Sequence, residues 1–191
     1  MARPRSFDPD DVLDVAREVF WRKGFQATSL DEITAASGIG KPSLYAAFGD
    51  KDALFLRVLD RYHDGILGWA ERTLAQPGSA RDAIQQWLMG FIPYCSGEKG
   101  QRGCFSIKSA SDGSLHQVEV RKSIERYNRR LEELIRARLR ADRAQFKKGF
   151  DPDISAHTIM VVHTGLMALA HQLPDPKQVK AVIDQVMALL A

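Results

Sequence analysis

The chain has 191 residues, of which 45% are hydrophobic, and it carries a formal net charge of +3 at pH 7. This length fits one ordinary domain or two small ones, and the apolar content is sufficient for a packed core. The sequence shows no run of about 18 apolar residues that would span a bilayer, and its N-terminus lacks the apolar segment of a signal peptide. The composition therefore predicts a globular, cytoplasmic protein without a membrane partner.

The basic residues are unevenly distributed. Residues 1–61 contain nine Lys and Arg residues against ten acids, so any DNA contact there must depend on placement rather than bulk charge. Residues 121–148 contain eleven Lys and Arg residues against four acids. We interpret this second segment as a solvated helix face, with nucleic-acid contact as the alternative.

A helix of about 15 residues is predicted near the N-terminus from its end signals and from apolar residues at helical spacing. Asp8 and Pro9 suit an N-cap and a first helical position, and Gly24 suits the helix end. Asp50 then suits the N-cap of a longer helix that begins near residue 51. The two helices offer an apolar frame for the segment between them.

Two short helices are predicted between these longer ones. The first begins at Ser29, where Glu32 completes a capping box, and it ends before Gly38. The second covers about residues 41–48, with Pro42 in its first turn, where the missing N–H costs nothing. Helices this short are not stable alone, so we predict a helix-turn-helix held by its neighbours.

The outer face of the second short helix has the chemistry of a DNA-reading surface. A helix N-terminus attracts phosphate, and lysine and hydroxyl side chains can reach the DNA backbone or base edges. A flexible basic arm can lie along the backbone or enter a minor groove. On this basis, the residues predicted to contact DNA are Arg3, Arg5, Lys41, Pro42, Ser43, Tyr45 and Lys51.

The order of these residues resembles the N-terminal DNA-binding domain of the TetR family of transcriptional regulators. The segment "VFWRKGFQATSLDEITAASGIGKPSLYAAFGDKDALF" carries the family's pattern of aromatic residues, glycines and the Leu-Tyr pair. The resemblance implies a homodimer that binds an operator of inverted symmetry, usually as a repressor. It also implies phosphate contacts from Thr28 and Ser29. The chain departs from the pattern at Gly40, Ala46 and Ala47, so specificity is expected to depend more on apolar contact and DNA shape.

The remaining chain is predicted to be helical over residues 79–94, 105–111, 114–145, 153–172 and 175–190. The expected fold is therefore all-α, with an N-terminal three-helix helix-turn-helix domain over residues 1–55 and a C-terminal helical regulatory and dimerisation domain over residues 56–191. The last two helices are the most apolar, and family members commonly dimerise through this pair. A monomer with a thick core is the alternative.

The C-terminal domain is also expected to bind an unknown small-molecule effector. Aromatic, sulfur and histidine side chains that could line an apolar pocket are Trp87, Phe91, Tyr94, Cys104, Phe105, Tyr127, Met160, His163 and Met167. Any one of these residues can instead be ordinary core. Cys95 and Cys104 lack the spacing of a metal site, and we interpret them as inert thiols, with redox or soft-metal sensing as the alternative.

Three function classes were compared. The first is a transcriptional repressor released from its operator by an effector, and the second is a constitutive regulator or activator without one. The third is a helical enzyme, but the sequence has no phosphate loop, no HExxH and no nucleophile elbow. We therefore expect a regulator that is not an enzyme and that uses no cofactor or metal.

Overall fold

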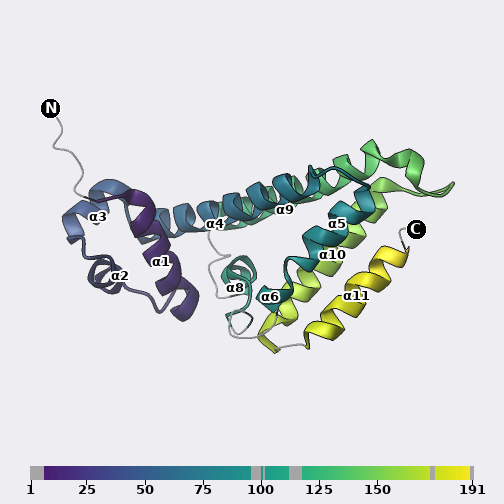
Figure 1. Cartoon of the computed structure of the whole chain (residues 1–191). Coiled ribbons are helices and arrows are strands. Elements are labelled where there is room, and N and C mark those ends of the chain that lie inside the picture. The colour runs from purple at the N-terminus through teal and green to yellow at the C-terminus, as the bar shows by residue number, and fades with distance from the viewer. Residues whose placement is uncertain (1–6, 96–99, 101, 112–117, 173–174, 190–191) are drawn as a thin grey trace. The chain divides into compact units, whose positions relative to one another are not determined.

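The computed structural model describes residues 7–95, 100, 102–111, 118–172 and 175–189, and these are helical with short connections (Figure 1). The chain divides into two compact units. Unit 1 contains residues 1–64 and 108–124, and unit 2 contains residues 65–107 and 125–191. The all-α fold with an N-terminal helix-turn-helix is confirmed.

Unit 1 begins with four helices whose bounds agree with the predicted ranges. They are α1 (Pro9–Lys23), α2 (Leu30–Ser37), α3 (Lys41–Phe48) and α4 (Lys51–Leu74), the last of which continues into unit 2. Both predicted caps of α2 are present: Ser29 and Glu32 form the capping box, and Gly38 is left-handed with φ +72°. The rings of Phe20, Phe25 and Phe55 pack together in the core of this unit.

Two later segments complete unit 1. The end of α8 (Phe105–Ser111) places Lys108 at the C-terminal end of α1, where its Nζ donates to the backbone oxygen of Trp21 at 2.5 Å and to that of Arg22 at 3.3 Å. The start of α9 (Val118–Ala141) places Ser123 against α4, where its hydroxyl donates to Asp60 at 2.5 Å. Residues far along the sequence therefore support the N-terminal helices.

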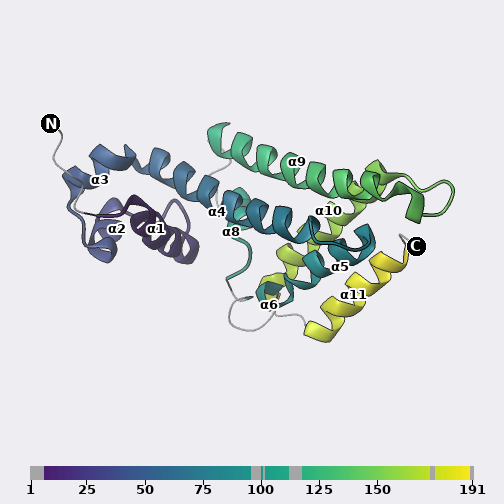
Figure 2. The ribbon, with the colours of Figure 1, turned by 45° about the horizontal axis from the view of Figure 1, so that its top comes forward.

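Unit 2 is a helical bundle that contains the end of α4 and most of α9. Its other helices are α5 (Ala80–Met89), α6 (Ile92–Cys95), α10 (Pro152–Leu169) and α11 (Pro176–Leu189), with 3-10 turns at Arg143–Gln145 and Ala170–Gln172. Helix α11 packs on α5 and α6, and α10 packs on α6 (Figures 1 and 2). A continuous apolar core joins these helices.

Two predicted helices of unit 2 differ from the structure. The predicted helix over residues 79–94 is divided into α5 and α6 at Gly90, where a Cβ would lie only 2.3 Å from the ring of Trp69. The helix predicted over residues 114–145 is α9, which ends at Ala141 and is followed by a 3-10 turn. Its predicted start at residues 114–117 lies outside the described residues.

Helix α10 corrects one expectation about membranes. The segment Pro152–Gln172 is long and apolar enough to cross a bilayer by length and composition, although 44% of it is buried inside the protein. Core helices of soluble proteins pass the same test, so a single such segment is weak evidence for a membrane span. In this chain, the buried side of α10 belongs to the core of unit 2 through Ala156, Ile159 and Met160.

Candidate nucleic-acid interface

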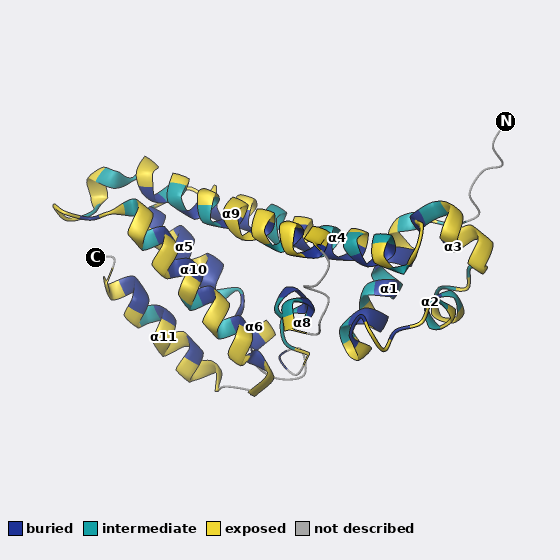
Figure 3. Ribbon diagram, turned by 180° about the vertical axis from the view of Figure 1, so that it is seen from behind, coloured by how far each residue is buried: buried dark blue, intermediate teal, exposed yellow. Residues whose placement is uncertain are grey.

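Helix α3 presents a clear division between its two sides. Leu44 and Phe48 are buried in unit 1, whereas Tyr45 is 51% exposed. The coloured ribbon shows this mixture of buried and exposed residues along the helix (Figure 3). The other exposed residues of α3 are Lys41, Pro42, Ser43 and Ala46. The structure thus brings together the four residues of the predicted reading surface that lie on α3.

The two ends of α3 are built differently. Gly40 is the N-cap and supplies no side-chain hydrogen bond, and the N–H of Ser43 donates instead to the backbone oxygen of Gly40 at 3.0 Å. At the other end, Arg57 of α4 donates to the backbone oxygen of Ala47 at 2.7 Å and lies 5.6 Å from the ring centre of Phe48. Sequence reasoning missed Arg57, because its contact depends on how α4 packs against α3. The arrangement fixes the helix at its C-terminal end.

Both predicted lysine contacts already have partners within unit 1. The Nζ of Lys41 lies 2.5 Å from the carboxylate of Asp31, which raises the pKa of Lys41 by hydrogen bonding and by its charge. The Nζ of Lys51 donates to the backbone oxygen of Gln26 at 3.3 Å and lies 4.5 Å from the ring centre of Phe25. Asp31 was not among the predicted site residues, although it lies in the first turn of α2, next to the capping residue Glu32.

The two residues at the start of α2 have different environments. Ser29 is exposed, but its side chain belongs to the capping box with Glu32. Lys23 also pairs with Glu32, and these contacts lower the pKa of that carboxyl to about 2. Thr28 differs from expectation: it is 2% exposed, and its hydroxyl donates to the backbone oxygen of Gly24 at 2.7 Å. Because it is buried, we omit Thr28 from the reading surface. Arg3 and Arg5 lie outside the described residues.

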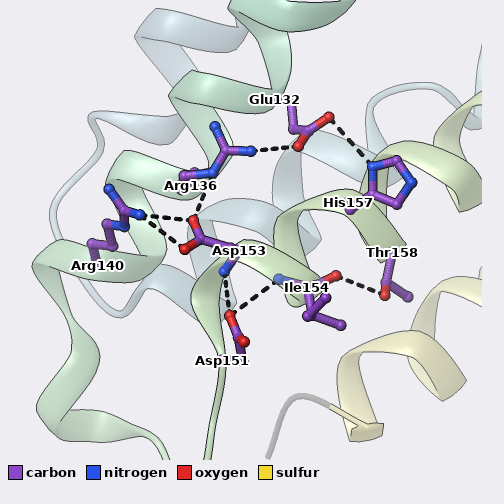
Figure 4. Close-up of polar contacts among 8 residues, drawn as sticks. All are labelled: Glu132, Arg136, Arg140, Asp151, Asp153, Ile154, His157 and Thr158. Atoms are coloured by element: carbon purple, nitrogen blue, oxygen red, sulfur yellow. Dashed lines mark hydrogen bonds and ion pairs between the residues drawn. The ribbon is translucent and has the colours of Figure 1, made fainter.

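The basic segment on α9 is partly neutralised by acids from other helices. Asp153 of α10 lies 2.8 Å from Arg136 and 2.8 Å from Arg140, and Arg136 also pairs with Glu132 (Figure 4). Arg130 lies 3.2 Å from Glu71 of α4. These ion pairs favour our interpretation of this segment as an ordinary helix face.

The predicted effector residues belong to unit 2, and several of them form one aromatic group. The ring centres of Trp87 and His163 are 5.1 Å apart, and those of Phe91 and His163 are 4.5 Å apart. Tyr94 differs, because it is 52% exposed and lies on the surface. The remaining buried members of the predicted set are Phe105, Tyr127, Met160 and Met167, and Cys104 is half-buried.

The two cysteines show no metal site. Cys95 is buried, and burial raises the pKa of its thiol to about 11, with a further contribution from nearby Cys104. A thiol with a raised pKa is poorly reactive, in agreement with our interpretation of Cys95. Among the described residues, no group of three His, Cys, Asp or Glu side chains could hold a metal ion.

Comparison with known proteins identifies the family. Residues 12–58 match the family described as "Bacterial regulatory proteins, tetR family". The chain is 32% identical over 157 residues to the HTH-type transcriptional regulator YezE of Bacillus subtilis. These residues cover 82% of this chain and 81% of YezE. The chain belongs to the TetR family. It is therefore a helix-turn-helix, DNA-binding transcriptional regulator, and its TetR-family relatives are regulators rather than enzymes.

Two further TetR-family proteins are similar to this chain. The repressor ComR of Escherichia coli is 32% identical over 123 residues, which cover 64% of this chain and 59% of ComR. The solved structure of a CifR cysteine mutant with 26-bp operator DNA has a TM-score of 0.86 and 29% identity, and it covers 99% of this chain and all of that one. The likeness to CifR extends across both units, well beyond the helix-turn-helix.

Proposed function

We propose that this TetR-family regulator is a cytoplasmic homodimer that represses transcription and leaves its operator when a small molecule binds. The operator has inverted symmetry, and each protomer inserts α3 into one half-site. Residues 1–55 form the DNA-binding domain, and residues 56–191 bind the effector and the second protomer. The observation that carries the proposal is the exposed face of α3, whose buried side is fixed to α4 by Arg57.

The reading surface supports DNA recognition through both its shape and its chemistry. Exposed Ala46 allows close approach to the groove, Ser43 can bond to base edges or phosphate, and Tyr45 can contact phosphate or a thymine methyl group. Lys41, Lys51 and Ser29 stand around the ends of the two short helices, where the DNA backbone would pass. Arg3 and Arg5 are proposed to follow that backbone.

The proposed dimer interface is the exposed apolar face of α10 and α11. Helix α10 exposes three large apolar side chains, with Ile154 66% exposed and Val161 59% exposed. Leu169 continues the row at helical spacing, and Val182 and Leu189 extend it on α11. Exposed apolar side chains in such a row mark a protein interface. A second copy of this chain covers them in the proposal, as the relationship to the TetR family implies.

Release by an effector would be a shift between two states of the dimer. In the DNA-bound state the two α3 helices sit about 34–36 Å apart, so that they enter successive major grooves. An effector that favours another separation must differ in binding to the two states by about 5.5 kcal/mol to move operator occupancy from 99% to 1%. Helix α4 belongs to both units and is the proposed link between them. The alternative is a constitutive regulator or activator without an effector.

The experiment that tests this function begins with selection of a binding site from random DNA by the full chain. Tyr45→Ala should weaken binding to the selected site at least about tenfold, which corresponds to about 1.4 kcal/mol, while the dimer remains intact by light scattering. Tyr94→Ala is the matched control, since Tyr94 is 52% exposed but lies in unit 2. Equal affinity of the two variants would remove Tyr45 from the reading surface.

A further inference from the structure

Unit 2 contains four buried nitrogen atoms that have no protein partner among the described residues. One is Nε of Arg138 on α9, and the other three are Nε1 of Trp87 on α5 and both ring nitrogens of His163 on α10. Trp87 is 0% exposed and His163 is 6% exposed. An unpaired buried polar group destabilises the folded state, so native proteins seldom keep one. Here two such side chains lie with their ring centres 5.1 Å apart.

The surroundings of the Trp87 and His163 nitrogens are apolar and aromatic. The ring of Phe91 lies 4.5 Å from that of His163 and 5.1 Å from that of Trp87, and Trp69 packs against Phe91 at 4.7 Å. Burial lowers the pKa of His163 to about 4, so its imidazole is neutral at pH 7. A neutral imidazole has one donor and one acceptor nitrogen, and the indole of Trp87 adds a second donor. A charged guest would be strongly disfavoured in such surroundings.

The same face of α10 provides side chains that can adapt to a guest. Met160 and Met167 stand three residues before and four residues after His163, so all three lie on one side of the helix. Both methionines are buried in the same core. Methionine side chains are flexible and polarisable, and they repack readily around planar ligands. The proposed site therefore depends on these two side chains to make room for a small molecule.

From these observations we infer that the effector is a neutral, planar, mainly apolar molecule with a hydrogen-bond acceptor, which accepts from Trp87 Nε1 and from the donor nitrogen of His163. A hydroxyl group on the same molecule would also satisfy the acceptor nitrogen of His163. This inference rests on the proposed ligand-regulated function and names the chemical class of its ligand. It assigns Trp87 and His163 as the polar contacts of the site.

The test uses three small probes of similar shape with the full-length protein labelled with ¹⁵N. Acetophenone is neutral and has a carbonyl acceptor, 2-phenylpropene replaces that oxygen by a methylene group, and benzoate carries a charge. The readout is the indole N–H signal of Trp87, assigned with Trp87→Phe. We expect acetophenone to shift this signal saturably and to bind about fivefold more tightly than 2-phenylpropene, as one net hydrogen bond implies. Benzoate should bind more weakly than either.

Two histidine variants test the ring nitrogens of His163 directly. His163→Phe keeps a ring and removes both nitrogens, so it should unfold at the same temperature as the original chain or a higher one, and it should lose most of the preference for acetophenone. His171→Phe is the matched control, because His171 is exposed at the end of the same segment, and it should keep the preference.

Several results would overturn the inference. These are the absence of a saturable shift of the Trp87 signal, equal affinity for acetophenone and 2-phenylpropene, or tighter binding of benzoate. A clear loss of stability in His163→Phe would also overturn it, since the nitrogens would then have a partner, such as an ordered water, in the free protein. Operator binding is measured separately without any probe. If the protein binds its operator but fails these tests, the inferred ligand class is wrong and the proposed DNA binding still holds.

Discussion

His163 makes the stability of the protein depend on pH. Its pKa is lowered from 6.5 to about 4 by burial, so between these values the unfolded chain binds a proton that the folded chain does not. The stability is therefore fully present above pH 6.5 and falls as the pH drops toward 4, by a total of about 3 kcal/mol. Urea unfolding between pH 4 and 7.5 measures this slope. The slope should be shallower in His163→Phe, and identical slopes for the two chains would contradict the assignment.

Asp31 forms an ion pair with Lys41, one of the proposed DNA contacts. The carboxylate holds Lys41 Nζ at 2.5 Å and adds a negative charge beside the proposed DNA backbone. Asp31→Asn should therefore tighten operator binding by about threefold at low salt, and the gain should shrink at higher salt because screening weakens exposed charges. Fluorescence anisotropy at two salt concentrations measures this effect. Asp64→Asn, at another exposed acid of unit 1, is the control, and weaker binding by Asp31→Asn would contradict the account.

At the scale of single elements, the turn between α2 and α3 depends on Gly38. Its φ of +72° lies in the left-handed region, although a Cβ there would meet no atom within 4 Å. Gly38→Ala should therefore destabilise unit 1 by backbone strain alone, by about 1 kcal/mol. Chemical denaturation measures the change, and Gly165→Ala is a control within a helix with open space. No loss of stability in Gly38→Ala would show that the turn relaxes easily.

Lys108 connects α8 to the end of α1 and is a positioning residue for the DNA-binding helices. Its Nζ donates to two backbone oxygens at the C-terminal end of that helix, where a positive charge is favourable. Lys108→Met should keep the packing of the apolar part of the side chain but remove the hydrogen bonds to α1. We expect operator affinity to fall about threefold to tenfold, with the dimer unchanged. Lys122→Met is the control, since Lys122 is exposed and pairs with Glu119 of its own helix. Unchanged operator affinity in Lys108→Met would show that Lys108 does not position the DNA-binding helices.

The sequence predicted some elements well because their signals are local. The capping box of Ser29, the turn at Gly38 and the proline of α3 all act within a few residues, and the structure has all of them. The break at Gly90 was not predicted, and the close approach of the Trp69 ring to this position could not be, because Trp69 lies on another helix. Arg57 and Lys108 were missed because their contacts are with other helices. Thr28 is buried, and its hydroxyl donates to the backbone oxygen of Gly24, four residues earlier.

At the scale of the whole molecule, the proposed function depends on pairing of two chains through α10 and α11. Val161 is 59% exposed near the middle of the proposed interface. Val161→Glu should place two like charges in the dimer contact, so we expect dissociation to increase at least about tenfold and operator binding to fall with it. Light scattering over a range of protein concentrations measures the dissociation. Ala144→Glu, at an exposed position outside the interface, is the control, and an intact Val161→Glu dimer would contradict the proposed interface.

We propose above all that this TetR-family regulator reads an operator of inverted symmetry with α3. The most direct measurement is footprinting of the full chain on its selected binding site, with the original sequence and with Tyr45→Ala. The account predicts two protected half-sites related by a two-fold axis, with centres about one turn of DNA apart, and loss of this protection in Tyr45→Ala. Protection of a single unrepeated site, or an unchanged footprint in Tyr45→Ala, would contradict it.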